Sequence, residues 1–123
     1  MSPLFKKIKN KVLGEAFDLS FAFVTPAQMR RAMKYKKLPP NELSKTKTSN
    51  VLSFPLSKTS GEILICKSAA KPYTAEYLFI HGLLHIKGLK HGATMERTEE
   101  KLLKQFSCKK LLPGSTSART KSR

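Results

Sequence analysis

All three histidines of this 123-residue chain lie within eleven residues, as His81, His85 and His91, and this cluster constrains the fold more than any other feature. His81 and His85 are four residues apart, so on a helix both side chains project from one face. Gly88 is a residue that commonly ends a helix, and a turn there would bring His91 back toward the other two. Residues 77–86 are apolar on nearly every side, which predicts a buried central helix.

Three imidazoles that converge while other coordination positions stay open are typical of a catalytic zinc site. Zinc would lower the pKa of a water ligand and supply a nucleophile at neutral pH. The alternative is three unrelated histidines. However, two imidazoles in a buried helix need partners, and no Asp or Glu lies between Tyr77 and Met95. A shared metal ion would satisfy both, so the sequence predicts one Zn²⁺ per chain, held by these three residues.

The spacing H-x3-H-x2-G-x2-H matches the zinc motif of metzincin proteases with one element missing. In that motif a glutamate follows the first histidine and acts as the general base. In this chain the corresponding residue is Gly82. The usual route of peptide hydrolysis therefore lacks its proton acceptor, and we expect a substrate other than a peptide.

The charge of the chain points to a polyanion. It carries 24 Lys and Arg against 8 Asp and Glu, a formal charge of +16, which favours nucleic acid as the partner. Residues 1–50 hold 11 of the basic side chains and 3 of the acidic ones, whereas residues 51–108 hold 8 and 5. A solvated surface is the alternative to a binding surface. The candidate RNA-binding residues in the two basic runs are Lys6, Lys7, Arg30, Arg31 and Lys34.

The length of the chain and its hydrophobic periodicity predict a single domain of helices and short strands over residues 1–111, with the HxxxH pair on a central helix. Helices are expected over residues 3–13, 26–35, 71–87 and 95–106, and strands over residues 17–24, 50–56 and 62–66. Thr25 and Gln28 are expected to form a capping box. Residues 38–49 are expected to be a loop, and residues 112–123 a basic disordered tail.

The compartment is predicted from the cysteines and from the apolar segments. Cys66 and Cys108 are too few for a disulfide framework, which is typical of a reduced, cytoplasmic protein. The first residues contain no apolar region of a signal peptide, and the longest apolar stretch is too short to cross a membrane. We expect no membrane partner, and the pattern leaves the oligomeric state open.

Three segments, in order, resemble the YbeY family of bacterial rRNA maturation factors, which are regarded as metal-dependent endoribonucleases. Residues 81–91, HGLLHIKGLKH, are similar to the family signature H-G-x-L-H-x-x-G-aromatic-D-H. Residues 49–55, SNVLSFP, resemble T-[DN]-V-L-S-F-P, and residues 61–66, GEILIC, resemble G-D-I-x-I-[CA]. The resemblance covers roughly residues 17–107.

The resemblance implies zinc at the three histidines and strands 53–55 and 61–66 as walls of the metal cleft. It also implies an α+β fold, in which a small mixed sheet packs with helices around the central HxxxH helix. It implies a hydrolase that cuts single-stranded RNA phosphodiester bonds in 16S rRNA processing and ribosome quality control. Its partners would be rRNA, the small ribosomal subunit and ribosomal proteins. The alternative is a catalytically weak, zinc-containing ribosome-assembly or RNA-binding factor.

Some positions depart from the family pattern. Lys90 stands where the family has Asp, and Leu89 where it has an aromatic residue. The arginine that the family carries upstream of its T-[DN]-V-L-S-F-P segment has no counterpart, and Lys45 and Lys47 are the nearest cations. We therefore expect Lys45, Lys47 and Lys90 to be the candidates for stabilising phosphate charge. The missing arginine is what leaves the non-catalytic alternative open.

Overall fold

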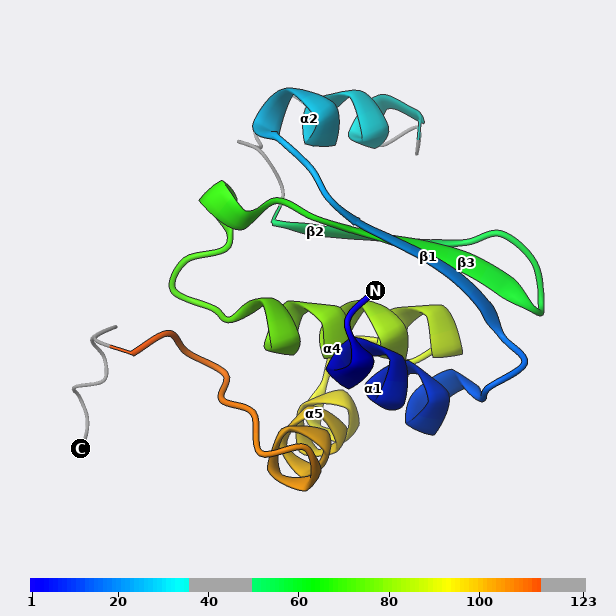
Figure 1. Ribbon diagram of the computed structural model, residues 1–123, viewed down its shortest axis with the longest axis vertical. Helices are drawn as coiled ribbons and strands as arrows, with labels where there is room; N and C mark the ends of the chain where they lie inside the picture. The colour runs from blue at the N-terminus through cyan, green and yellow to red at the C-terminus, as the bar shows by residue number, and fades with distance from the viewer. Residues whose placement is uncertain (36–49, 114–123) are drawn as a thin grey trace.

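A three-stranded mixed sheet forms the middle layer of the protein (Figure 1). The computed structural model describes residues 1–35 and 50–113. Strand β3 (Ser60–Ile65) lies at the centre of the sheet, parallel to β1 (Asp18–Phe23) and antiparallel to β2 (Val51–Pro55). The register pairs Phe21 with Ile63 and Ile63 with Ser53, so these three side chains share one face of the sheet.

Helices cover both faces of the sheet (Figure 1). Helices α1 (Pro3–Leu13), α4 (Ala75–Lys87) and α5 (Ala93–Gln105) lie on one side, and α2 (Pro26–Tyr35) lies on the other. A short 3-10 turn, η1 (Lys67–Ala69), leads from β3 toward α4. No helix in residues 1–35 or 50–113 is long and apolar enough to cross a membrane.

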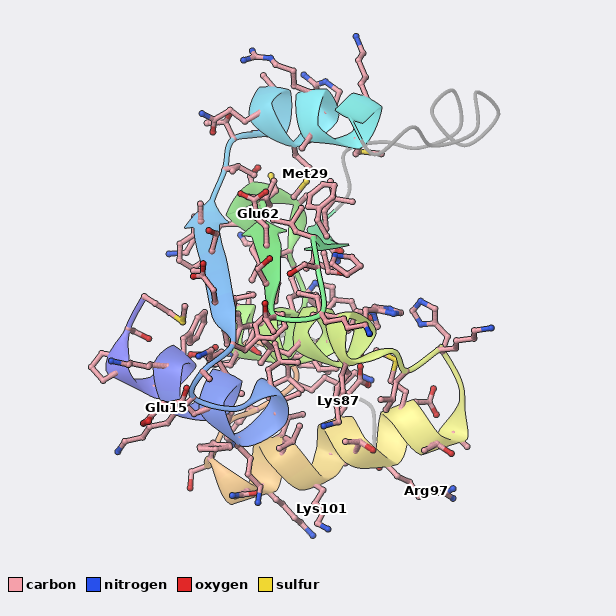
Figure 2. All side chains as sticks on the ribbon, turned by 90° about the vertical axis from the view of Figure 1, so that its right-hand side faces the viewer. Glu15, Met29, Glu62, Lys87, Arg97 and Lys101 are labelled. Atoms are coloured by element: carbon pink, nitrogen blue, oxygen red, sulfur yellow. The ribbon has the colours of Figure 1, made fainter. Side chains whose placement is uncertain are left out.

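The main core lies between the sheet and the three helices on its first side. Phe79 of α4 is fully buried, stacks on Phe5 of α1 at a centroid distance of 4.3 Å, and meets Phe21 of β1 edge-on at 5.2 Å. Figure 2 shows Lys87 of α4 pointing between α1 and α5, where its Nζ donates a hydrogen bond to the carbonyl of Val12 (3.0 Å). These contacts fix α4 between its neighbours.

A second, smaller core lies under α2. Met29 points from this helix toward the sheet (Figure 2), and together with Met33 it packs on Leu52 and Cys66. Cys66 and Cys108 are both free thiols. The sheet is therefore apolar on both faces, as its short runs of Val, Ile, Leu and Phe predict.

Local capping signals fix where two of the helices begin. The Thr25 amide donates to Gln28 Oε1 (2.9 Å) and the Gln28 amide donates to Thr25 Oγ1 (3.1 Å), so the predicted capping box at α2 is confirmed. At α4, Thr74 Oγ1 accepts from the Tyr77 amide (3.0 Å) and donates to the carbonyl of Lys109 (2.6 Å). That second bond ties the start of α4 to the chain that follows α5.

The predicted single α+β fold with a mixed sheet is confirmed. Most element ends lie within two residues of their expected positions, although the predicted helix over 71–87 begins only at Ala75. The predicted loop at 38–49 and residues 114–123 of the predicted tail lie outside the described residues. The amide of Leu112 donates to the carbonyl of Pro72 (2.8 Å). A domain boundary at residue 111 stays a prediction.

Candidate metal centre

Helix α4 presents His81 and His85 side by side. Leu78, Phe79, Ile80, Leu83 and Leu84 of this helix are buried, so the helix cannot rotate without exposing its apolar sides. The two histidines are partly buried on the remaining side, and their Nε2 atoms lie 3.1 Å apart. The predicted HxxxH pair is thus held rigidly by the packing of its helix.

The chain folds back after α4, and this fold-back turn (residues 88–91) brings His91 beside His81 and His85. Gly88 ends α4 with a left-handed φ of 110°, and its amide donates to the carbonyls of Leu84 (3.1 Å) and His85 (3.0 Å). The His91 ring centroid then lies 5.1 Å from that of His81 and 4.5 Å from that of His85. One ring nitrogen from each histidine lies within 4.8 Å of the others, so the group could hold a metal ion.

A cleft of about 610 Å³ opens beside the histidines. Its lining residues come from β2, the residue before it, α4 and the fold-back turn: Asn50, Val51, Leu52, Ser53, Pro55, His81, Gly82, His85 and His91. The expected wall at 53–55 is confirmed. The expectation of a second wall at 61–66 is wrong, because β3 is the central strand and α4 lies directly over it.

Gly82 marks the closest approach of α4 to the sheet. A Cβ atom at this position would lie 3.1 Å from Cδ1 of Ile63, which is tighter than most real Cβ contacts. Gly61 of β3 shows the same closeness, since its Cβ would meet Cδ1 of Ile86 at 3.2 Å. Glycine at position 82 therefore serves the packing of helix on sheet, at the position where metzincin proteases carry their catalytic glutamate.

Glu99 of α5 contacts the histidine cluster, and the sequence alone did not predict this contact. Its Oε2 lies 2.6 Å from Nδ1 of His81, and Tyr77 donates a long hydrogen bond to its Oε1 (3.4 Å). The expectation that no acid serves the histidines is wrong, because α5 folds back and returns a glutamate from beyond Met95. A usable signal existed: Glu99 lies on the apolar stripe of α5 with Met95, Leu102 and Leu103.

Burial and the Glu99 carboxylate raise the pKa of Tyr77 to about 12. Nζ of Lys110 lies 5.1 Å from the centroid of the Tyr77 ring. The neutral phenol is therefore the form that the fold favours, and it can donate a hydrogen bond to Glu99. The hydroxyl and the carboxylate form a polar layer between α4 and α5.

The predicted cations are not gathered at the cleft. Lys90 is exposed and is not among the lining residues, whereas Lys45 and Lys47 lie outside the described residues. The candidate RNA-binding residues lie in exposed positions on two helices: Lys6 and Lys7 on α1, and Arg30, Arg31 and Lys34 on α2. Because α1 and α2 cover opposite faces of the sheet (Figure 1), the described structure does not join these two groups in one patch.

The donor set suits a zinc ion. Zinc takes imidazole nitrogens readily, and catalytic sites keep three protein ligands with a further position open. With Nδ1 of His81 turned to Glu99, the Nε2 atom remains directed toward Nε2 of His85. The three residues therefore fit the metal that the sequence predicts.

Comparisons with known proteins find one family. The family described as Endoribonuclease YbeY matches residues 3–107. A protein named Endoribonuclease YbeY from Buchnera aphidicola subsp. Acyrthosiphon pisum is 27% identical over 128 residues, which cover 86% of this chain and 81% of that protein. One of the same name from Rubrobacter xylanophilus is 38% identical over 87 residues, which cover 67% of this chain and 58% of that protein.

Metal-dependent hydrolases share such an arrangement, in which an HxxxH helix meets a third histidine at an open cleft. Within that class, the chain belongs to the YbeY endoribonuclease family. The resemblance found in the sequence is thereby confirmed, and with it an RNA hydrolase whose family is metal-dependent.

Proposed function

We propose that this protein is a zinc-dependent endoribonuclease that cuts single-stranded segments of 16S rRNA in the cytoplasm, during small-subunit maturation and ribosome quality control. The observation that carries the proposal is the convergence of three imidazoles beside an open cleft. Membership of the YbeY family supports RNA as the substrate. The small ribosomal subunit, with its proteins, would be the partner.

His81, His85 and His91 are the proposed ligands of one Zn²⁺ per chain. A zinc ion supplies Lewis acidity toward phosphodiester oxygens and lowers the pKa of a water ligand. The protein contributes the rigid arrangement: two ligands are fixed by the packing of α4, and the third is set by the left-handed turn at Gly88. Preorganised ligands need no rearrangement during the reaction, which is where such sites gain their rate.

The rest of the cleft suits a nucleotide chain better than a peptide. Gly82 supplies no carboxylate next to the first ligand, so the proton acceptor of metzincin proteases is missing. Asn50 and Ser53 bring an amide and a hydroxyl to the same cleft as the histidines. Both groups are common partners of phosphate and ribose oxygens.

Basic side chains away from the cleft are the proposed docking sites for RNA. Lys6 and Lys7 on α1 and the cations of α2 would contact phosphates, and Lys45, Lys47 and Lys90 stay the candidates for stabilising phosphate charge. Phosphate contacts release counterions, so binding to RNA should weaken steeply as salt rises. The formal charge of +16 should make this salt dependence large.

The proposal is tested by cleavage of a single-stranded 16S rRNA fragment. Wild type, His81→Ala and the control Thr94→Ala are compared, each with and without a zinc chelator. Thr94 is exposed near His91, but it does not line the cleft. We expect cleavage by wild type and Thr94→Ala, its loss on chelation, and no cleavage by His81→Ala.

Three results would count against the proposal. Zinc binding with ribosome association but no cleavage would favour the alternative of a catalytically weak assembly factor. Absence of zinc from the native protein would remove the metal site itself. Cleavage that survives both the chelator and His81→Ala would show that the activity in the preparation does not come from the metal site.

A further inference from the structure

We propose that Glu99 is a positioning residue of the metal centre: it holds the His81 ring so that Nε2, rather than Nδ1, faces the ligand cluster. The inference rests on the proposed metal site at the three histidines. It extends that site to a fourth side chain, on a different helix, that would not itself touch the metal.

The two nitrogens of His81 have different neighbours. Nδ1 lies 2.6 Å from Oε2 of Glu99, whereas Nε2 lies 3.1 Å from Nε2 of His85. An ionised carboxylate can only accept hydrogen bonds, so Nδ1 must carry the ring proton. The lone pair is then on Nε2, which is the nitrogen that the cluster offers to a cation. The carboxylate thus selects both the tautomer and the angle of the ring.

The placement of Glu99 in the core makes a purely structural role a poor explanation. Met95, Leu102 and Leu103 share its stripe on α5, and the glutamate is itself only 4% exposed. Burying a carboxylate costs free energy that its hydrogen bonds offset only in part. A core glutamate that contacts a ligand histidine therefore serves the site better than it serves the stability of the fold.

The second oxygen of the Glu99 carboxylate also accepts a hydrogen bond. Tyr77 lies one helical turn before His81 on α4, and its hydroxyl donates to Oε1 of Glu99 (3.4 Å). The Tyr77 ring is covered in turn by Nζ of Lys110 (5.1 Å), from the segment that Thr74 ties to α4. The two carboxylate oxygens therefore have separate partners, which together fix the orientation of the group beside His81.

Zinc affinity and the stability of the zinc-free protein separate the two roles. Glu99→Gln keeps the shape of the side chain but removes its charge, and Glu99→Met replaces it with an apolar residue of similar length. Glu100→Gln changes the adjacent, exposed glutamate of the same helix and is the matched control. Zinc-free full-length chains are titrated with zinc against a chromogenic chelator. Their thermal unfolding is measured in the same buffer without metal.

We expect both Glu99 variants to bind zinc about 10- to 100-fold more weakly than wild type, the usual effect of losing such a partner. Glu99→Gln should unfold near the temperature of zinc-free wild type, because its amide oxygen can still accept a hydrogen bond, whereas Glu99→Met leaves Nδ1 of His81 and the Tyr77 hydroxyl without an acceptor and should unfold at a lower one. Glu100→Gln should match wild type in both measurements.

Each other outcome is decisive. Unchanged zinc affinity in both Glu99 variants would overturn the inference while leaving the metal site intact. Failure of both variants to fold, or a lower unfolding temperature with unchanged affinity, would show that Glu99 serves the fold and would also overturn it. If wild type binds no zinc in the same titration, it is the proposed function that fails.

Discussion

Gly82 of α4 lies directly on Ile63 of β3, so closely that a Cβ atom on the glycine would come within 3.1 Å of Cδ1 of the isoleucine. In metzincin proteases the residue after the first zinc histidine is the catalytic glutamate. In this protein the same position is part of the contact between helix and sheet. One glycine thus brings α4 close to the sheet and leaves the cleft without the base of a protease.

Enlarging residue 82 should lower stability. Gly82→Leu must push Ile63 aside, and we expect its free energy of unfolding to fall by about 1–3 kcal/mol, as overpacking usually costs. Gly82→Ala is the matched comparison, because the gain of about 1 kcal/mol in helix propensity offsets a smaller clash. Urea denaturation measures both. Equal stability of Gly82→Leu and wild type would contradict the close packing.

Removing the Thr74 hydroxyl should weaken the start of α4 and its link to the chain that follows α5. Its Oγ1 caps α4 through the Tyr77 amide and donates to the carbonyl of Lys109, so Thr74→Ala loses both bonds. We expect the free energy of unfolding to fall by about 1–2 kcal/mol. Thr74→Ser keeps the hydroxyl and should retain most of the stability. A serine variant as unstable as the alanine variant would assign the effect to the methyl group instead.

The raised pKa of Tyr77 predicts a loss of stability in alkali. The folded protein holds this proton up to about pH 12, whereas an unfolded tyrosine releases it near pH 10. Between these values the folded state binds more protons than the unfolded state, so the free energy of unfolding falls as pH rises. In Tyr77→Phe the fall should be smaller. Urea unfolding at several pH values checks this, and parallel curves for the two proteins would contradict it.

Zinc should stabilise the fold through the histidine cluster. A ligand at 100 times its Kd adds about 2.7 kcal/mol to the free energy of unfolding. Addition of zinc should therefore raise the Tm of wild type and leave His91→Ala unchanged. His91 is exposed, so the zinc-free variant should unfold at nearly the wild-type temperature. An equal rise of Tm in the variant would mean that the stabilising zinc binds elsewhere.

The sequence predicted the parts of the site that depend on neighbours along the chain. The four-residue spacing of His81 and His85 and the helix end at Gly88 are local signals, so the three-histidine cluster could be predicted from the sequence alone. The contact between His81 and Glu99 joins residues 18 positions apart and depends on how α5 crosses α4. Periodicity shows that Glu99 lies on the buried stripe of α5, but not which side chain it meets there.

The order of the strands in the sheet could not be predicted from the sequence for a similar reason. Alternating apolar residues predicted the three strands, but the pairing of β1 with β3 across a long connection was not encoded locally. The strand at 61–66 was therefore expected at the cleft, whereas it lies in the middle of the sheet under Gly82. The close approach at Gly82 depends on the position of Ile63 beneath it, which no pattern along the helix encodes.

The most direct test of the central claim is a zinc titration of the chelated protein, with the initial rate of cleavage of a single-stranded 16S rRNA fragment as the readout. The account predicts that the rate rises from zero and levels off at one zinc per chain, and that His91→Ala shows no rise at the same concentrations. A rate that is already full without zinc, or that rises equally in His91→Ala, would contradict it.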